Sequence, residues 1–64
     1  MNIIVNGQPQ IVADTSTVAS LISEHDTQGT AIAVNGRLVK RPEWKSTPLH
    51  SGDQVVIIKA AYGG

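Results

Sequence analysis

The residues of this 64-residue chain that suggest chemistry are its last three, Tyr62, Gly63 and Gly64. A free α-carboxylate is ionised at neutral pH and is a poor acyl donor, whereas its mixed anhydride with AMP is electrophilic. To form that anhydride from ATP, the carboxylate has to enter the nucleotide site of another protein. Glycine has no Cβ, so Gly63 and Gly64 can pass through a narrow channel. Tyr62 is then the last residue whose side chain a partner can contact. Chance places two glycines at the end of about 0.5% of chains, so the pair alone is weak support.

Other reactive side chains show no spacing that suits catalysis or metal binding. His25 and His50 are the residues able to act as a base near neutral pH, and no nucleophile has a fixed relation to either. The absence of cysteine excludes disulfides, thiolate catalysis and cysteine-based zinc sites. The carboxylates are scattered without ligand spacing: Asp14, Glu24, Asp26, Glu43 and Asp53. We therefore expect a carrier rather than an enzyme, with no catalytic residue, no metal and no bound cofactor.

Length and charge narrow the classes of partner. A chain of this size forms one domain that buries roughly 60% of its unfolded surface, so a functional site is expected on a surface or at a terminus. Five basic residues balance five acidic ones, which argues against nucleic acid as a partner. The sequence shows neither a signal peptide nor an apolar run of ~20 residues. We expect no membrane association and a cytoplasmic location.

Two Asn-Gly pairs define the hairpins that must support this terminus. Asn-Gly favours a two-residue type I′ turn, because both residues tolerate positive φ. Asn6-Gly7 is expected to join strands at residues 3–5 and 10–13, and Asn35-Gly36 to join strands at 31–34 and 38–39. Pro9 lacks an N–H and belongs at the start of its strand or on a sheet edge.

One amphipathic helix is expected between the two hairpins. Thr17 is the predicted N-cap, and Val18, Leu21, Ile22 and His25 follow at i, i+3, i+4 and i+7. The helix should end before residue 29. The segment 41–49 contains two prolines and is expected to be irregular, and a turn at 51–53 should lead into a last strand at 54–60.

This order predicts an α+β domain over residues 1–60, with a mixed sheet of four to five strands packed on one helix, and a flexible tail over residues 61–64. The first and last strands should be central and parallel. Alternation assigns the core: Ile3, Val5, Val18, Leu21, Ile22, Ile32, Val34, Val55 and Ile57. The opposite face is expected to carry Ile4, Ala33, Val56 and Ile58. These aliphatic residues suggest a docking surface, although such residues are also usual in central strands.

The sequence resembles the ThiS family of sulfur carrier proteins of thiamine biosynthesis, small members of the ubiquitin-like β-grasp group. The resemblance runs from end to end and is most specific in the second half. The matching residues are Thr17-Val18-x-x-Leu21-Ile22, Val34-Asn35-Gly36, Val39-x-Arg41-x-x-Trp44, Leu49-x-x-Gly52-Asp53-x-Val55 and Gly63-Gly64.

The resemblance implies a function for the terminal carboxylate. In such proteins a ThiF-like enzyme, related to ubiquitin-activating enzymes, uses ATP to adenylate the terminal glycine, here Gly64, with Gly63 as its spacer. Sulfur from a cysteine desulfurase system then displaces AMP and leaves a thiocarboxylate, from which a ThiG-like thiazole synthase takes the sulfur. The aliphatic face matches the place where β-grasp carriers usually meet their activating enzyme. Trp44 and Leu49 are expected to pack in the core, whereas Arg41 either supports a loop or touches a partner.

Two departures from the family pattern and three alternative functions remain. Pro42 follows Arg41, whereas proline tends to precede the arginine in the family, and Tyr62 is bulkier than the usual residue before the glycines. The chain also fits a sulfur carrier of the type of the molybdopterin synthase small subunit, or a ubiquitin-like modifier joined through Gly64 to lysines of other proteins. A binding module that uses only its open sheet face is the third alternative.

Overall fold

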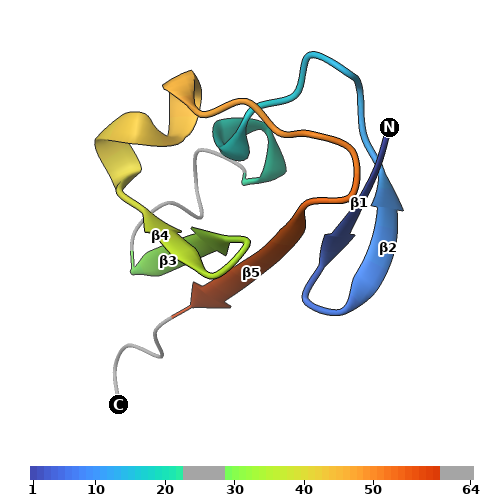
Figure 1. Ribbon diagram of the computed structural model, residues 1–64. Helices are drawn as coiled ribbons and strands as arrows, with labels where there is room; N and C mark the ends of the chain where they lie inside the picture. Colours follow the sequence, from blue (N-terminus) through green and yellow to red (C-terminus); the bar gives the residue numbers. More distant parts are fainter. Residues whose placement is uncertain (23–28, 60–64) are drawn as a thin grey trace.

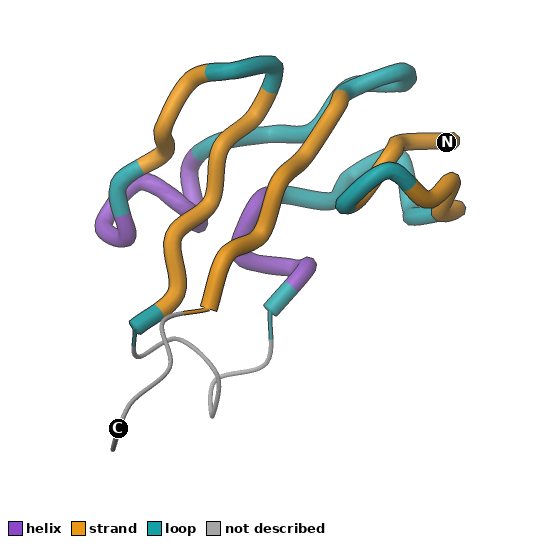
Figure 2. Tube along the Cα trace, turned by 90° about the horizontal axis from the view of Figure 1, so that it is seen from below, coloured by secondary structure: helices purple, strands orange, loops and turns teal. Residues whose placement is uncertain are grey.

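The computed structural model describes residues 1–22 and 29–59, and the strands in this part of the chain form one mixed sheet (Figures 1 and 2). The sheet has five strands in the order β2-β1-β5-β3-β4. β1 and β5 are parallel, and the other neighbours are antiparallel. The elements are β1 (Asn2–Val5), β2 (Gln8–Ile11), η1 (Val18–Leu21), β3 (Thr30–Val34), β4 (Arg37–Val39), η3 (Arg41–Ser46) and β5 (Gln54–Lys59). The prediction that the first and last strands are central and parallel is confirmed, since β1 and β5 pair in parallel and each has a further strand on its other side.

Both Asn-Gly turns form as predicted. Asn6 and Gly7 have φ of 51° and 80°, and Asn35 and Gly36 have φ of 52° and 81°, which are the left-handed values of a type I′ turn. The second strand, however, occupies 8–11 rather than 10–13, because a two-residue turn leads directly into the pair Val5–Gln8. Pro9 lies in this edge strand. Proline is tolerated there because an edge strand does not need every N–H for pairing within the sheet.

The prediction of an amphipathic α-helix after Thr17 is wrong for residues 18–22, the part of it that the structure describes. A single 3₁₀ turn, η1, replaces it, and Ile22 already has extended backbone with φ of −129° and ψ of 134°. β-Branched residues disfavour helix, and Thr17, Val18 and Ile22 are all β-branched. The Val18 N–H also donates to the Thr47 carbonyl at 3.0 Å, which ties this segment to the loop after η3. Thr17 is the N-cap as predicted, whereas His25 lies outside the described residues.

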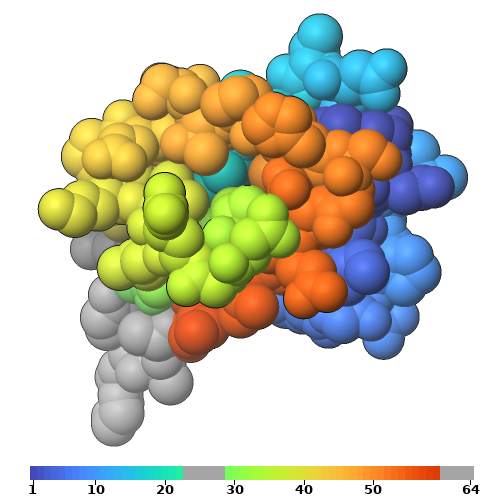
Figure 3. Space-filling view, viewed as in Figure 1, coloured from blue at the N-terminus to red at the C-terminus, as the bar shows by residue number. Residues whose placement is uncertain are grey.

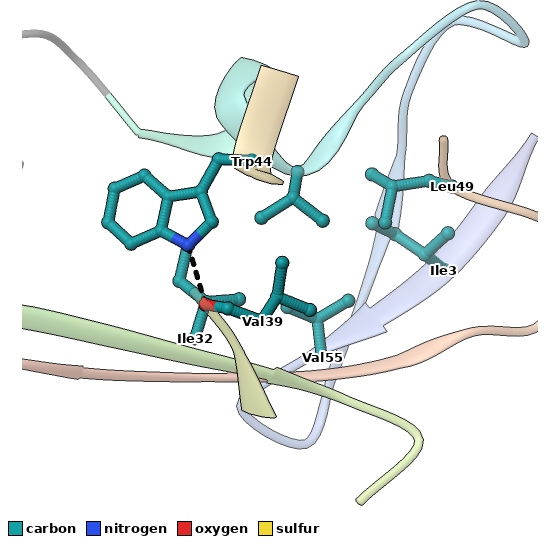
Figure 4. Close-up of a cluster of buried hydrophobic side chains, with 7 residues drawn as sticks. Ile3, Ile32, Val39, Trp44, Leu49 and Val55 are labelled. Carbon is teal, nitrogen blue, oxygen red and sulfur yellow. Dashed lines mark hydrogen bonds between the residues drawn. The ribbon is translucent and has the colours of Figure 1, made fainter. Parts of the chain in front are cut away.

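The segment expected to be irregular begins with a second 3₁₀ helix, η3. Pro42 lies in its first turn, where a missing N–H costs little because that group has no helical acceptor. The helix directs Trp44 into the core, where its side chain is 4% exposed. The indole N–H donates to the Val39 carbonyl at 2.8 Å (Figure 4), so Trp44 links η3 to the edge strand β4.

The two 3₁₀ helices cover one face of the sheet and leave the other face open (Figure 1). Leu49, in the loop after η3, is buried as predicted. Val5, Leu21, Ile22, Val34 and Ile57 are half-buried around the core. The buried apolar residues are Ile3, Val18, Ile32, Val39, Trp44, Leu49 and Val55. The predicted core is therefore confirmed, with Val39 as a further member. No helix within 1–22 or 29–59 is long and apolar enough to span a membrane.

Substitution of Trp44 measures how much this domain depends on its largest core side chain. We expect Trp44→Ala to lower the free energy of unfolding by about 3–5 kcal/mol, the usual cost of an aromatic-to-alanine change in a core. Urea denaturation followed by far-UV circular dichroism measures the loss. Leu38→Ala is the matched control, because Leu38 is large, apolar and exposed, and it should cost no more than about 0.5 kcal/mol. Equal losses in the two variants would contradict the assigned core.

Candidate functional site

The predicted reactive terminus follows β5, the central strand of the sheet. β5 pairs with β1 through Gln54 and Val55, and with β3 through five consecutive pairs that end at Thr30–Lys59. The strand is therefore fixed on both sides up to the point where the last five residues of the chain begin. Tyr62, Gly63 and Gly64 lie outside the described residues, so their role stays a prediction.

Asn6 holds β5 where its pairing with β1 ends. The Asn6 N–H donates to the Val55 carbonyl at 2.9 Å, and the Asn6 Oδ1 accepts the Ile57 N–H at 2.8 Å. The Asn6 side-chain oxygen thus accepts the N–H of Ile57, the next bond of the β1–β5 ladder, in place of a backbone carbonyl. One residue therefore supplies both the turn geometry of the first hairpin and a contact to the last strand.

Asn35 has the same double role at the other hairpin. Its N–H donates to the Gln54 carbonyl at 2.7 Å, and its Oδ1 accepts the Gln54 N–H at 2.9 Å. The remaining group of its amide, Nδ2, donates to Oδ1 of Asp53 at 3.0 Å. The asparagines of both Asn-Gly turns therefore bind β5 from opposite sides.

Asp53 completes this arrangement at the start of β5. Its side chain is buried, with the residue 8% exposed. Besides the bond from Asn35, its Oδ2 accepts the His50 N–H at 2.8 Å, and its own carbonyl accepts the Ile4 N–H at 2.9 Å. Gly52, with φ of 87°, provides the predicted turn before it.

The bond between Asn35 and Asp53 was not predicted from the sequence, which places the two residues in separate turns. The signal was present in the resemblance, since both residues belong to its matching segments. Sequence spacing alone does not reveal the contact, because 18 positions separate the two residues.

The predicted docking residues do lie on the open face of the sheet. Val56 and Ile58 are 46% and 59% exposed, and Ile4 is exposed on β1. Ala33, half-buried on β3, pairs directly with Val56. The structure thus brings Ala33, Val56 and Ile58 together on two neighbouring strands, with Ile4 on the other side of β5. No contact with a partner tests this surface, so docking remains a proposal.

Leu38 belongs to the same face and was missed. It pairs with Ala33, so Leu38, Ala33 and Val56 form a row across three strands. Its side chain is 64% exposed. Leu38 precedes Val39, and alternation along a strand places neighbouring side chains on opposite faces. The predicted strand was only two residues long, which is too short to show that alternation clearly.

The titratable groups form no metal-binding cluster in the described segments. His50 is exposed, and its Nδ1 lies 3.9 Å from Oδ2 of Asp53. No group of three or more histidine, aspartate or glutamate side chains within residues 1–22 and 29–59 is placed to hold a metal ion. The Asp53 carboxylate is already occupied by two hydrogen bonds, so its role here is structural.

Exchange of Asp53 for asparagine tests the hydrogen bonds at the start of β5. Both carboxylate oxygens accept a bond, so the amide of Asp53→Asn has to point its NH₂ group at a donor. We expect the free energy of unfolding to fall by about 1–3 kcal/mol, the cost of a buried unsatisfied polar group. Chemical denaturation measures the change, with Asp14→Asn as the control, since the side chain of Asp14 is 88% exposed. Equal stability of the two variants would show that the bonds to Asp53 contribute nothing.

Comparison with known proteins agrees with this architecture. The family model of the ThiS family matches residues 3–64. The sulfur carrier protein ThiS of Escherichia coli (strain K12) is 32% identical over 66 residues, and the match covers all of both chains. A crystal structure of the thiamine biosynthesis protein (ThiS) from Geobacter metallireducens superposes with a TM-score of 0.82 at 29% identity, again over all of both chains. A solution NMR structure of a thiamine biosynthesis protein from the same organism gives 0.75 at 27% identity, covering all of this chain and 88% of that one.

These matches confirm the predicted fold class, a ubiquitin-like β-grasp domain with a mixed sheet and a small helical layer. The family match spans residues 3–64, a range that includes Asn35, Asp53 and the Gly63-Gly64 end. The chain belongs to the ThiS family.

Proposed function

We propose that this chain is a cytoplasmic sulfur carrier protein for the synthesis of the thiamine thiazole, and that it acts as a protein co-substrate rather than as an enzyme. The observation that carries the proposal is the family match, which extends to Gly64. The full-length similarity to a sulfur carrier protein from Escherichia coli supports it. The sheet supports it further, because the strand that precedes the C-terminal residues, β5, is the central strand and is paired on both sides.

In this proposal the chemistry takes place at the Gly64 carboxylate in two steps. A carboxylate oxygen attacks the α-phosphorus of ATP in the site of a ThiF-like enzyme, and pyrophosphate leaves. Sulfur at the oxidation level of sulfide then forms a bond to the acyl carbon as the bond to AMP breaks. If the cysteine desulfurase system delivers the sulfur as a persulfide, a thiol must also reduce the S–S bond. A ThiG-like thiazole synthase takes the sulfur from the resulting thiocarboxylate.

The domain supplies position rather than catalysis. Five residues follow Lys59, and a fully extended chain of that length reaches about 17 Å. The activating site therefore has to lie within that distance of the end of β5 when the carrier is bound. Gly63 and Tyr62 are the proposed tail residues that pass into the site, and the open face through Ile4, Ala33, Val56 and Ile58 is the proposed docking surface.

Two related functions differ in the product that they form. A carrier of the molybdopterin synthase type shares the thiocarboxylate and differs in the enzyme that consumes it. A ubiquitin-like modifier shares the adenylate and ends as an isopeptide on a lysine. The identity of the bond formed at Gly64 therefore separates the modifier from both carriers, and the accepting enzyme separates the two carriers.

Intact mass spectrometry after incubation with the adenylating enzyme of the same organism, ATP and a sulfur source tests the central step. We expect a mass gain equal to sulfur replacing oxygen, localised by fragmentation to the C-terminal peptide. A variant with one alanine added after Gly64 is the control, because the carboxylate is then displaced from the reacting phosphate, and it should remain unmodified. An unchanged wild-type mass, with an enzyme that activates a control carrier, would refute the proposal in favour of a binding module.

Ile58→Glu tests the proposed docking surface. Ile58 is exposed on β5, so the variant should lose no more than about 1 kcal/mol of stability. A charge in an apolar interface should weaken binding to the adenylating enzyme by about fivefold or more, measured by calorimetry. Ile11→Glu is the matched control, since Ile11 is 81% exposed on the far edge strand β2. Unfolding of Ile58→Glu, or equal binding by both variants, would contradict the assigned surface.

A further inference from the structure

Asn6-Gly7 and Asn35-Gly36 are the same dipeptide in the same conformation, and each also follows a valine. The φ angles of the two asparagines are 51° and 52°, and those of the two glycines are 80° and 81°. All four residues are exposed, and β5 lies between the two hairpins that they close (Figures 1 and 3). A difference in reactivity between the two asparagines therefore reflects mainly their tertiary contacts.

An asparagine followed by glycine can lose its side-chain amide without an enzyme. The glycine nitrogen gives its proton to a base and attacks Cγ of the asparagine, and ammonia leaves as a five-membered succinimide ring closes. Water then opens the ring at either carbonyl and leaves aspartate or isoaspartate. In sum, an amide and one water become a carboxylate and ammonium, and neither an oxidant nor a reductant takes part.

The attacking nitrogen has similar surroundings in both turns. At Gly7 and at Gly36, the position that a Cβ would occupy has no atom within 4 Å other than those of adjacent residues. Neither glycine N–H donates a hydrogen bond to another described residue. In both turns the asparagine Oδ1 accepts a backbone N–H of β5, from Ile57 in the first and from Gln54 in the second. None of these features distinguishes the two sites.

The asparagine side-chain nitrogen distinguishes them, because among the described residues only that of Asn35 has a partner. The Gln54 N–H is a donor, so it fixes Oδ1 of Asn35 and turns Nδ2 toward Asp53. Nδ2 donates to Oδ1 of Asp53 at 3.0 Å, and Oδ2 of Asp53 is held by the His50 N–H. Nδ2 of Asn6 forms no hydrogen bond with any residue of 1–22 or 29–59. Rotation of Cγ toward the glycine nitrogen therefore breaks an additional bond to a carboxylate at Asn35.

We propose that Asn6 is a site of spontaneous deamidation and that the bond to Asp53 protects Asn35 from the same reaction. A hydrogen bond to an ionised group is stronger than one between neutral groups, and it has to break before the ring can close. The reaction therefore converts the asparagine of the first turn to aspartate or isoaspartate, while the second turn keeps its amide.

The aspartate products would differ in their effect on the domain. An aspartate at position 6 retains an oxygen that accepts the Ile57 N–H, at a residue that is exposed. An aspartate at position 35 would place a carboxylate oxygen where Nδ2 now lies, 3.0 Å from Oδ1 of Asp53. Two carboxylates at such a distance repel each other. The protected asparagine is therefore the one whose conversion would disturb the start of β5.

The test follows both sites in one molecule during incubation of the folded protein in mildly alkaline buffer, because base removes the proton of the glycine nitrogen. A glutamate-specific protease, used at acidic pH, cleaves after Glu24 and Glu43 and so places the two asparagines in different peptides. Mass spectrometry gives each rate from the mass gain of replacing NH₂ by OH. The same chain in concentrated urea supplies the reference for local sequence. Asp53→Ala removes the acceptor of the Asn35 amide, and Asp14→Ala is its matched control, since the side chain of Asp14 is 88% exposed.

In the folded wild type we expect Asn6 to react about tenfold or more faster than Asn35, and in urea the two rates should agree within about threefold. Asp53→Ala should accelerate Asn35 about tenfold and leave the rate at Asn6 within about twofold, whereas Asp14→Ala should change neither rate by more than about twofold. Equal rates in the folded chain, no reaction at either site, or a difference that persists in urea would overturn the proposal. An equal rise at both sites in Asp53→Ala would also overturn it, because the protection would then come from global stability rather than from the bond to Asp53.

Discussion

The placement of β5 between β1 and β3 is the constraint on which the rest of this structure depends. Side chains from both hairpin turns bind this strand, Asn6 at Ile57 on one side and Asn35 at Gln54 on the other. Asp53 joins the second of these contacts to the turn that precedes the strand. Because residues 1–22 and 29–59 contain only a small group of buried apolar side chains, such polar contacts help to specify one register where apolar packing alone would permit slippage.

The two faces of the sheet around β5 differ in what covers them. One face is closed by η1, η3 and the loop of Leu49, with Trp44 filling the space between η3 and β4. The other face stays open and carries aliphatic side chains on β1, β5 and β4. The proposed function requires this division, because the core has to stabilise the domain alone while the open face is the proposed docking surface.

The proposed chemistry fits a protein that offers a substrate group and leaves activation to its partner. A glycine carboxylate becomes reactive only in a site that binds ATP, and no group of three or more histidine, aspartate or glutamate side chains among residues 1–22 and 29–59 is placed to hold a metal ion. In the proposal, the domain contributes the position of the end of β5 relative to the proposed docking surface.

The sequence by itself determined the features that depend on local backbone preference and alternation. The two Asn-Gly turns form because their positive φ is a property of those residues. The inward and outward sets on β3 and β5 follow from the period of two in a strand. Tertiary structure decided the remainder, because those features rest on contacts between distant segments. The bond of Thr47 to Val18 accompanies the reduction of the expected helix to one turn, and Val39 and Trp44 pair only once η3 has folded over the sheet. The contact between Asn35 and Asp53 likewise exists only because β5 lies beside β3, which no local preference specifies.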